Sequence, residues 1–396
     1  MANRVMNPTV DRPQRLMRRK TNLPFAAVAL VALLWGLPGT LLSATPTPGE
    51  AQAPPSQTAK TGRELYDAAC AACHAVDGRG ATRTMVGFET PLPDFTDCSF
   101  ATREPDADWA AVIHDGGPAR AFAEIMPVFG EALSAEQILG LVDYLRTFCR
   151  SAAWPRGDLN LPRPLVTEKA FPEDEAVWTT AVAAEGRGAV ENTFVYEHRI
   201  GARNHVELSV PFVVQRSGGS GWSGGIGDIA FDFKRVLYHD LDRGSIFSVV
   251  GEVSLPSGNK ARGFGKGVTV FEPFVAFGQI LPKDSFLQFQ GGFELPAHDL
   301  EKEAFFRFAG GKTFVQGSFG RSWTPMMELL GAREFATGAQ TAWDLLPQVQ
   351  ITLSKRQHIM MNVGARVPVN NSGQRNTQIL FYLLWDWFDG GLLDGW

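Results

Sequence analysis

The C-terminal half of the chain carries a two-residue alternation, and this feature constrains its fold more than any other. Apolar side chains occupy every second position in about 11 segments between residues 189 and 388. In one segment Val206, Leu208 and Val210 alternate with Glu207 and Ser209. Residues 177–184 supply a further candidate strand. Because Gly, Asp, Asn and Pro punctuate the segments, they predict an antiparallel sheet.

Two architectures fit this alternation, a transmembrane β-barrel and a soluble β-sandwich. Large apolar residues fill the outward positions of nearly every segment, which favours a barrel over residues 177–396. Aromatic residues also gather near the strand ends, as in an interfacial girdle: Tyr196, Trp222, Tyr238, Trp343, Trp385 and Trp387. Bacterial barrels close with an even number of strands, so we predict about 12, with 10 as the alternative.

Charged side chains on the opposite face of these strands would line the barrel lumen. The candidates are Asp232, Lys234, Glu252, Glu294, Arg307 and Arg366. They suit either a hydrated pore or a salt-bridged network that fills a narrow barrel.

A C-x-x-C-H motif lies upstream of the alternating half. In this pattern two thiols, here Cys70 and Cys73, attach one haem c covalently, and His74 takes one axial position on its iron. Met126, in the segment Ile-Met-Pro-Val-Phe-Gly, is the candidate for the opposite axial position. With both positions filled, the iron suits electron transfer better than substrate activation, so we expect no enzyme activity at the haem.

The remaining cysteines, Cys98 and Cys149, fall in the same segment. In an oxidising compartment they would pair as a disulfide, and two separate buried thiols are the alternative.

The N-terminus predicts export. Basic residues precede an apolar run over residues 23–44 that contains Gly36, Pro38 and Gly39, so residues 1–53 are interpreted as a signal peptide and tether. A transmembrane anchor is the alternative, because the run approaches spanning length. Residues 151–176 contain Pro155, Pro162, Pro164 and Pro172 without apolar periodicity, and predict a stiff linker.

Helices are expected at residues 62–72, 106–113 and 134–145, the last behind a capping box that begins at Ser134. The motifs of residues 60–150 resemble those of a class I cytochrome c. In chain order they are Gly62-Arg-Glu-Leu-Tyr66, Cys70-Ala-Ala-Cys-His74, Trp109-Ala-Ala-Val-Ile113, Gly116-Gly117, Met126-Pro-Val-Phe129 and Leu141-Val-Asp-Tyr-Leu145. The resemblance implies a small all-α domain with haem thioethers at Cys70 and Cys73 and axial ligands His74 and Met126. Met85 and His114 are rival ligands, but neither precedes the family's Pro-x-Phe.

Charge indicates the class of partner. Residues 60–150 carry 8 basic and 14 acidic side chains, a balance of about −6. This charge favours periplasmic redox proteins with a basic docking face over nucleic acid.

The whole arrangement resembles the cytochrome–porin fusions of iron-oxidising bacteria, and the segment from Gly224 to Lys234 resembles transporter-type outer-membrane proteins. The resemblance implies an outer-membrane protein of a Gram-negative bacterium with its cytochrome on the periplasmic side. It would pass electrons between periplasmic partners and a donor or acceptor reached through the barrel, such as a reduced metal ion. In the alternative hypothesis the barrel is a solute channel or lipid-embedded anchor, and the tethered cytochrome transfers no electrons across the membrane.

Overall fold

The computed structural model describes residues 60–185, 188–216, 221–371 and 375–386. The predicted signal peptide and tether, and residues 387–396 with the predicted girdle residue Trp387, lie outside the described residues. Within the described ranges no helix is both long enough and apolar enough to cross a bilayer.

The first part of the described chain is helical. Its elements are α2 (Gly62–Leu65), the π-helical η1 (Tyr66–Cys70), α3 (Ala71–His74), α4 (Arg83–Val86), α5 (Cys98–Ala101), α6 (Asp106–Asp115), the 3₁₀ turn η2 (Gly117–Arg120) and α7 (Ala135–Arg146). The three predicted helices are confirmed, and Ser134 forms its capping box with Gln137 at the start of α7.

The helices enclose one apolar core. Leu65 and Tyr66 pack with Leu141 and Leu145 of α7, as the sequence predicts. At the crossing point a Cβ on Gly62 would lie 2.0 Å from the carbonyl oxygen of Gly140, so only glycine permits this approach. The crossing fixes the helix that delivers Cys70, Cys73 and His74.

The second part is a sheet of long antiparallel strands. They are β1 (Glu175–Ala183), β2 (Ala189–Ile200), β3 (Asn204–Arg216), β5 (Ile229–Asp240), β6 (Ser245–Leu255), β7 (Val270–Leu281), β8 (Ser285–Pro296), β9 (Glu303–Lys312), β11 (Ser322–Glu334), β12 (Ala342–Thr352), β13 (Ile359–Pro368) and β14 (Gln378–Asp386). Two shorter strands, β4 (Trp222–Ile226) and β10 (Phe314–Val315), pair with β3 and β11.

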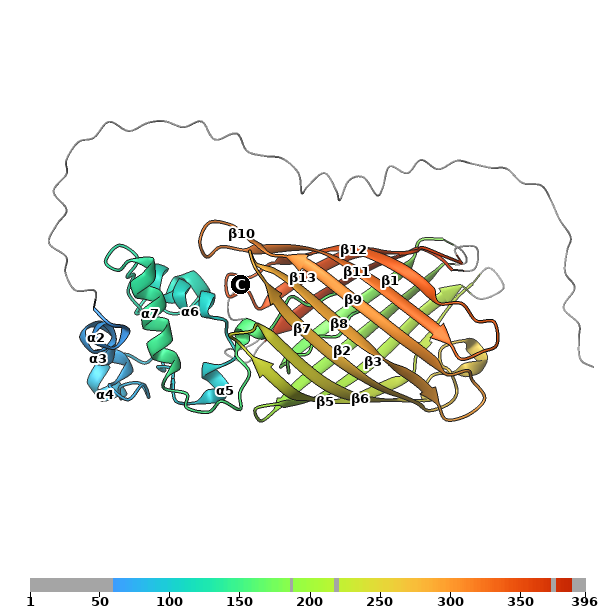
Figure 1. The fold of residues 1–396 in the computed structure, drawn as a ribbon, viewed down its shortest axis with the longest axis horizontal. Helices are drawn as coiled ribbons and strands as arrows, with labels where there is room; N and C mark the ends of the chain where they lie inside the picture. The colour runs from blue at the N-terminus through green and yellow to red at the C-terminus, as the bar shows by residue number, and fades with distance from the viewer. Residues whose placement is uncertain (1–59, 186–187, 217–220, 372–374, 387–396) are drawn as a thin grey trace, which may run out of the picture. The chain divides into compact units, whose positions relative to one another are not determined.

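The sheet closes into a barrel. Each long strand pairs with the next along the chain, and β1 pairs with β14 over nine residue pairs, from Glu175 with Asp386 to Ala183 with Gln378. Twelve long strands within the described residues therefore form one ring, and the predicted number of strands is confirmed. Figure 1 shows the strands tilted across the barrel. The ring of twelve long strands therefore has no open edge, as a transmembrane sheet requires.

The two faces of the barrel differ in polarity. Large apolar side chains stand on the outer face with about two-fifths to one-half of their surface exposed, for example Phe231 at 49% and Leu287 at 52%. Polar side chains on the inner face are buried, including Lys234 and Glu328 at 0% exposure. This apolar-out, polar-in arrangement is the one that a lipid-embedded barrel needs.

The predicted linker has an unexpected location. Residues 157–174, which we call the luminal segment, enter the barrel and pack against its inner face. The backbone N–H of Leu165 donates to Glu328 of β11 over 3.0 Å, and Gln288 of β8 donates to the carbonyl oxygen of Pro162 over 2.8 Å. Leu159 and Leu161 are buried. These residues thus join the two domains but do not form a solvent-exposed spacer.

Most predicted luminal charges belong to a network of ion pairs and hydrogen bonds. Lys234 binds Glu168 of the luminal segment, Arg366 binds Asp344, and Glu294 binds Lys266. Arg307 donates to Gln290 and to the carbonyl oxygen of Val166. The filled-barrel alternative thus describes the lumen better than a hydrated pore.

Candidate functional site: the haem-binding motif and its surroundings

The C-x-x-C-H motif lies where η1 continues into α3. Cys70 ends the π-helical turn, and Cys73 and His74 occupy the following α-turn. The hydroxyl of Tyr66, a fully buried residue, donates to the carbonyl oxygen of Ala75 over 2.6 Å. This hydrogen bond ties the end of the motif to the helix before it.

Both thiols of the motif are free. Cys70 and Cys73 are half-buried and form no disulfide. Burial, with a smaller contribution from the neighbouring Cys73, raises the pKa of the Cys70 thiol to about 11.

His74 has the protonation state and the surroundings of an iron ligand. Its burial lowers the pKa of the imidazole below the usual value, so the ring stays neutral and keeps a lone pair for a metal. Its Nδ1 atom is buried and has no hydrogen-bond partner among the described residues. The ring lies 5.1 Å from that of Phe95 between centroids. A buried neutral imidazole beside two free thiols fits a covalently attached haem.

Met126 lies in the loop that follows η2, and its side chain packs against the same core as Cys70 and Ala71. Gly117 donates to the carbonyl oxygen of Met126 over 3.3 Å, and a Cβ on Gly117 would lie 2.2 Å from the carbonyl oxygen of Ala123. The glycine therefore lets the methionine loop fold closely onto η2.

The rival ligands have different surroundings. Met85 is 78% exposed and is not among the residues of the helical core. Nδ1 of His114 lies 2.5 Å from Asp115, and its ring lies 5.3 Å from that of Phe319, a residue that precedes β11. Met126 is thus the only one of these three side chains that packs on the core beside Cys70.

Cys98 and Cys149 are joined by a disulfide across 51 residues. The bond connects the start of α5 to the segment after α7. It closes the helical part of the chain on the side that leads into the luminal segment.

Residues 57–145 match the family model described as cytochrome C oxidase, cbb3-type, subunit III. This segment is a cytochrome c domain. The chain as a whole is a cytochrome c domain followed by a closed antiparallel barrel. No curated protein matches the chain by sequence.

Several solved outer-membrane barrels are similar to the barrel. An outer membrane channel from Pseudomonas putida F1 shares 12% identity with a TM-score of 0.42, over 57% of this chain and 99% of that one. The KdgM porin shares 12% identity with a TM-score of 0.34, over 54% of this chain and 99% of that one. The NanC porin shares 10% identity with a TM-score of 0.36, over 53% of this chain and 97% of that one.

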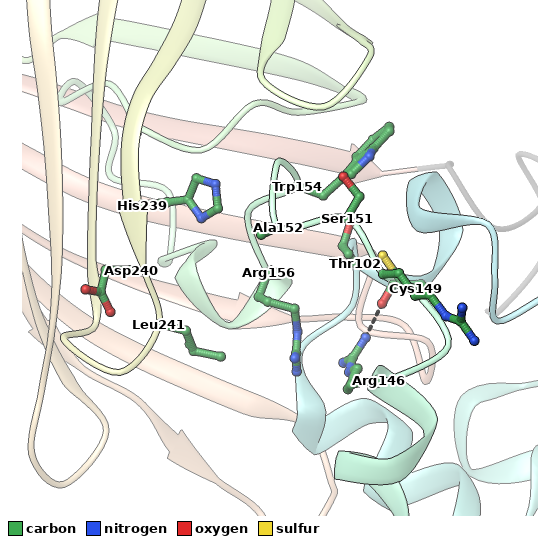
Figure 2. A pocket seen from close by; sticks show the side chains of 12 residues that line it. Thr102, Arg146, Cys149, Ser151, Ala152, Trp154, Arg156, His239, Asp240 and Leu241 are labelled. Atoms are coloured by element: carbon green, nitrogen blue, oxygen red, sulfur yellow. Dashed lines mark hydrogen bonds between the residues drawn. The ribbon is translucent and has the colours of Figure 1, made fainter.

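A hollow of about 490 Å³ lies where the cytochrome domain leads into the luminal segment. Arg146, Trp154, Arg156 and His239 are among the residues that line it (Figure 2). Arg146 and Arg156 both bind Asp106. Arg156 also binds Asp158 of the luminal segment, so the arginines of this hollow hold α6, α7 and the luminal segment together.

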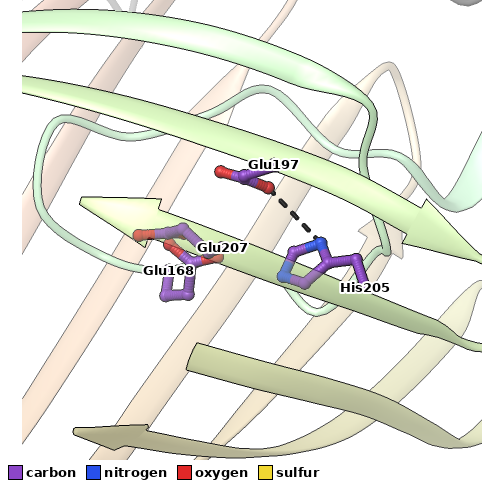
Figure 3. Close-up of side chains that lie close together, drawn as sticks. All are labelled: Glu168, Glu197, His205 and Glu207. Atoms are coloured by element: carbon purple, nitrogen blue, oxygen red, sulfur yellow. Dashed lines mark ion pairs between the residues drawn. The ribbon is translucent and has the colours of Figure 1, made fainter. Parts of the chain in front are cut away.

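A second cluster was not predicted from the sequence. Glu168 of the luminal segment meets Glu197, His205 and Glu207 on the inner face of β2 and β3 (Figure 3). The alternation assigns Glu197 and Glu207 to the luminal face, but it does not show that Glu168 lies beside them. Glu168 lies 29 residues before Glu197 in a segment without apolar periodicity, so local patterns carry no signal for its place in the cluster.

Proposed function

We propose that this protein is an electron-transfer protein of the bacterial outer membrane. One haem c is attached to Cys70 and Cys73, with His74 and Met126 as axial ligands. The observation that carries the proposal is the union, in one chain, of a cytochrome c domain with a closed barrel whose outer face is apolar. When bound, the haem supplies one-electron chemistry, and the protein residues set its ligation, burial and access to partners.

The connections between strands support a periplasmic location for the cytochrome. Outer-membrane barrels have short periplasmic turns and longer extracellular loops. One end of the barrel faces the cytochrome domain, because Arg203 there donates to the carbonyl oxygen of Ala153. The connections at this end include two short ones, at residues 201–203 and 282–284. On the opposite side, residues 256–269 connect β6 to β7. Because β1 begins and β14 ends on the cytochrome side, we assign that side to the periplasm.

Periplasmic partners would then reach the cytochrome directly. The net charge of about −6 over residues 60–150 favours, as partner, a soluble redox protein with a basic docking face. The donor or acceptor on the other side, a reduced metal ion among the candidates, would exchange electrons through the barrel. Because the luminal segment packs inside the barrel, this reagent must be small or must act on groups within the lumen.

Purified holoprotein in sealed liposomes tests the proposal. With the cytochrome outside, an internal redox dye should exchange electrons with an external protein that cannot cross the membrane. A Cys70→Ser, Cys73→Ser variant, which cannot attach haem, should leave the dye unchanged. Equal rates in both samples would contradict electron transfer through the haem.

The alternative is a barrel that only anchors a tethered cytochrome. The luminal segment favours an anchor over an open solute channel, because its backbone is bonded directly to Glu328 and Gln288. Under this alternative the internal dye stays unchanged, while the haem of the same liposomes is still reduced by an external redox protein. That combination of results separates the two functions.

A further inference from the structure

A row of carboxylates crosses the luminal face on neighbouring strands, and we call it the acidic row. Glu197 lies directly opposite Glu207 in the register of β2 and β3, and Glu207 lies opposite Asp232 of β5. The row continues from Asp232 to Glu252 of β6 and on to Glu272 of β7. Farther around the barrel, Glu294, Glu303 and Glu334 are paired in the same way. Like charges directly opposite each other destabilise a sheet, so the row needs compensating positive charge.

The acidic row runs from one end of the barrel to the other. Glu197 lies near the end of β2, close to the turn where Arg203 contacts the cytochrome side. Glu334 is the last residue of β11, a strand that begins on the cytochrome side after Phe319, whose carbonyl oxygen accepts from Arg120. Because barrel strands tilt, a row that crosses them also climbs along the barrel axis. The row thus places carboxylates at several levels between the far end of the barrel and Glu197, where they attract cations.

Three carboxylates converge at the inner end of this row. Glu168, Glu197 and Glu207, together with His205, each place one ligand atom within 4.8 Å of the others (Figure 3). Glu197 and His205 have no exposed surface. Among the described residues no donor forms a hydrogen bond to the buried Oε2 of Glu197. Nδ1 of His205 lies 3.4 Å from this oxygen, but it already accepts the backbone N–H of Glu173 and has no proton to donate. A fully buried carboxylate oxygen without a donor, among two other carboxylates, points to a cation as its missing partner.

Each carboxylate is oriented through one of its oxygens. Lys234 holds Oε1 of Glu168 over 2.5 Å, and Arg163 holds Oε1 of Glu197 over 2.5 Å. The hydroxyl of Ser209 donates to Oε1 of Glu207 over 2.8 Å. The remaining oxygens of Glu197 and Glu207 accept no hydrogen bond from described residues, and Oε2 of Glu168 has only Arg163 at 3.7 Å. One oxygen of each carboxylate is therefore available as a ligand.

The ring of His205 is not arranged as a nitrogen ligand. Its Nδ1 accepts the backbone N–H of Glu173 over 3.0 Å, so in the neutral ring the proton resides on Nε2. Nε2 lies 3.7 Å from Oδ1 of Asp232, and neither atom has a hydrogen-bond partner among the described residues. The ligands offered to a metal are thus oxygen atoms, which suit hard cations such as Ca²⁺, Mg²⁺ and Mn²⁺.

The charges around the cluster do not balance. Six carboxylates face three basic side chains: Glu168, Glu173, Glu175, Glu197, Glu207 and Asp232 against Arg163, Lys169 and Lys234. An uncompensated charge away from water costs several kcal/mol. We propose that Glu168, Glu197 and Glu207 bind a hard divalent cation, which enters along the acidic row and fastens the luminal segment to β2 and β3.

Mn²⁺ binding to the full-length holoprotein in detergent tests this site without involving electron transfer. We expect the electron paramagnetic resonance signal of free Mn²⁺ to fall by one equivalent per chain, and Ca²⁺ to displace the bound ion. The bound Mn²⁺ should show no coupling to a directly coordinated nitrogen, because His205 is not a ligand. Binding that stays absent up to about 1 mM Mn²⁺, the weak end of protein calcium sites, would show that protons balance the charge and would overturn the proposal.

Two matched variants locate the site. Glu207→Gln keeps the size of the side chain but removes one ligand charge, and it should weaken Mn²⁺ binding at least tenfold. Glu191→Gln makes the same change on the luminal side of β2, six positions before Glu197, and should leave affinity unchanged. Equal losses in the two variants would show diffuse attraction to the lumen. Ca²⁺ should also raise the unfolding temperature of the wild-type barrel but not that of Glu207→Gln, and equal increases would contradict the site.

Discussion

Nε2 of His358, in the turn between β12 and β13, lies 2.7 Å from Oε1 of Glu104, 254 residues earlier in the cytochrome domain. The imidazole donates and the carboxylate accepts, and both side chains are largely buried. Arg356 of the same turn donates to the carbonyl oxygens of Arg120 and Ala121 over 3.2 and 3.1 Å. The cytochrome domain and the barrel are therefore joined by specific contacts as well as by the chain between them.

Removal of this imidazole should loosen the contact. In His358→Ala the carboxylate of Glu104 loses its hydrogen-bond donor. We expect the free energy of the contact between the cytochrome domain and the barrel to weaken by about 1–3 kcal/mol. Hydrogen exchange should become faster in residues 353–358 and 117–121. His298→Ala is the control, because His298 is an exposed residue of the loop before β9 and its ring pairs with the exposed Asp299. Unchanged exchange in His358→Ala would show that the hydrogen bond does not hold the domain.

Axial ligation by Met126 gives a second prediction. Met126→Ala should open the sixth position of the iron, lower the reduction potential and allow carbon monoxide to bind the reduced protein at once. Met85→Ala should leave the spectrum and the potential unchanged, because Met85 is 78% exposed. Absorption spectroscopy with and without carbon monoxide checks both. If Met85→Ala alone loses the sulfur-to-iron absorption band, the assignment of Met126 is wrong.

The barrel could be predicted because the alternation that specifies its strands lies within short stretches of sequence. Phe231 and Phe233 face outwards at 49% and 48% exposure, while Asp232 and Lys234 between them are buried. This alternation follows directly from the two-residue period of a strand. The capping box at Ser134 is local as well, because its two hydrogen bonds span three residues. Patterns of this kind are complete within a few positions and need no knowledge of distant contacts.

The luminal segment and its carboxylate cluster could not be predicted in this way. Leu165 and Thr167 donate their backbone N–H groups to Glu328, 163 and 161 residues later. Prolines near Leu165 indicate an extended chain but not whether it lies in solvent or in the barrel. The acidic row is similarly hidden, since Glu197, Glu207 and Asp232 become neighbours only through the register of three strands.

Glu328 should decide whether the luminal segment stays in place. Its carboxylate accepts the backbone N–H groups of Leu165, Val166 and Thr167 over 2.6–3.1 Å, and Gln348 donates to it as well. Glu328→Ala would leave these buried donors unpaired. We therefore expect the free energy that holds the luminal segment in the barrel to fall by about 3–5 kcal/mol. Planar-bilayer recordings should show larger or more frequent conductance events.

The matched control for this change is Glu191→Ala, on the luminal face of β2 and outside the acidic row. It removes an equal charge at an exposed position, where no described backbone donor of the luminal segment is bound. Equal conductance in Glu328→Ala and the wild type would show that other contacts suffice to hold the segment.

Asp108 should make the stability of the cytochrome domain depend on pH. Burial, and next the nearby Glu104, raise the pKa of Asp108 to about 7, although Arg120 donates to it over 2.7 Å and opposes the shift. An acid with a higher pKa in the folded state holds its proton more tightly when folded. Its stabilising contribution is therefore full below about pH 4 and is lost as the pH rises towards 7.

The expected loss from Asp108 over that range is at most about 4 kcal/mol. Urea unfolding followed by haem absorbance, at intervals from pH 4 to 7, should show a smaller slope in Asp108→Asn than in the wild type. Asp143→Asn, at an exposed position of α7, controls for the change in net charge. Parallel curves for Asp108→Asn and the wild type would exclude a raised pKa.

The disulfide between Cys98 and Cys149 should account for much of the stability of the helical domain. It closes a loop of 51 residues, and by the chain-entropy relation a loop of that length stabilises the folded state by about 4 kcal/mol. A Cys98→Ala, Cys149→Ala variant should unfold at a correspondingly lower urea concentration while keeping its haem. Dithiothreitol should shift the wild type by the same amount and leave the double variant unchanged, because thioether bonds are not reduced by thiols. Chemical labelling should confirm that dithiothreitol frees both thiols in the wild type. If the urea unfolding curve nevertheless stays unchanged, the disulfide does not stabilise the domain.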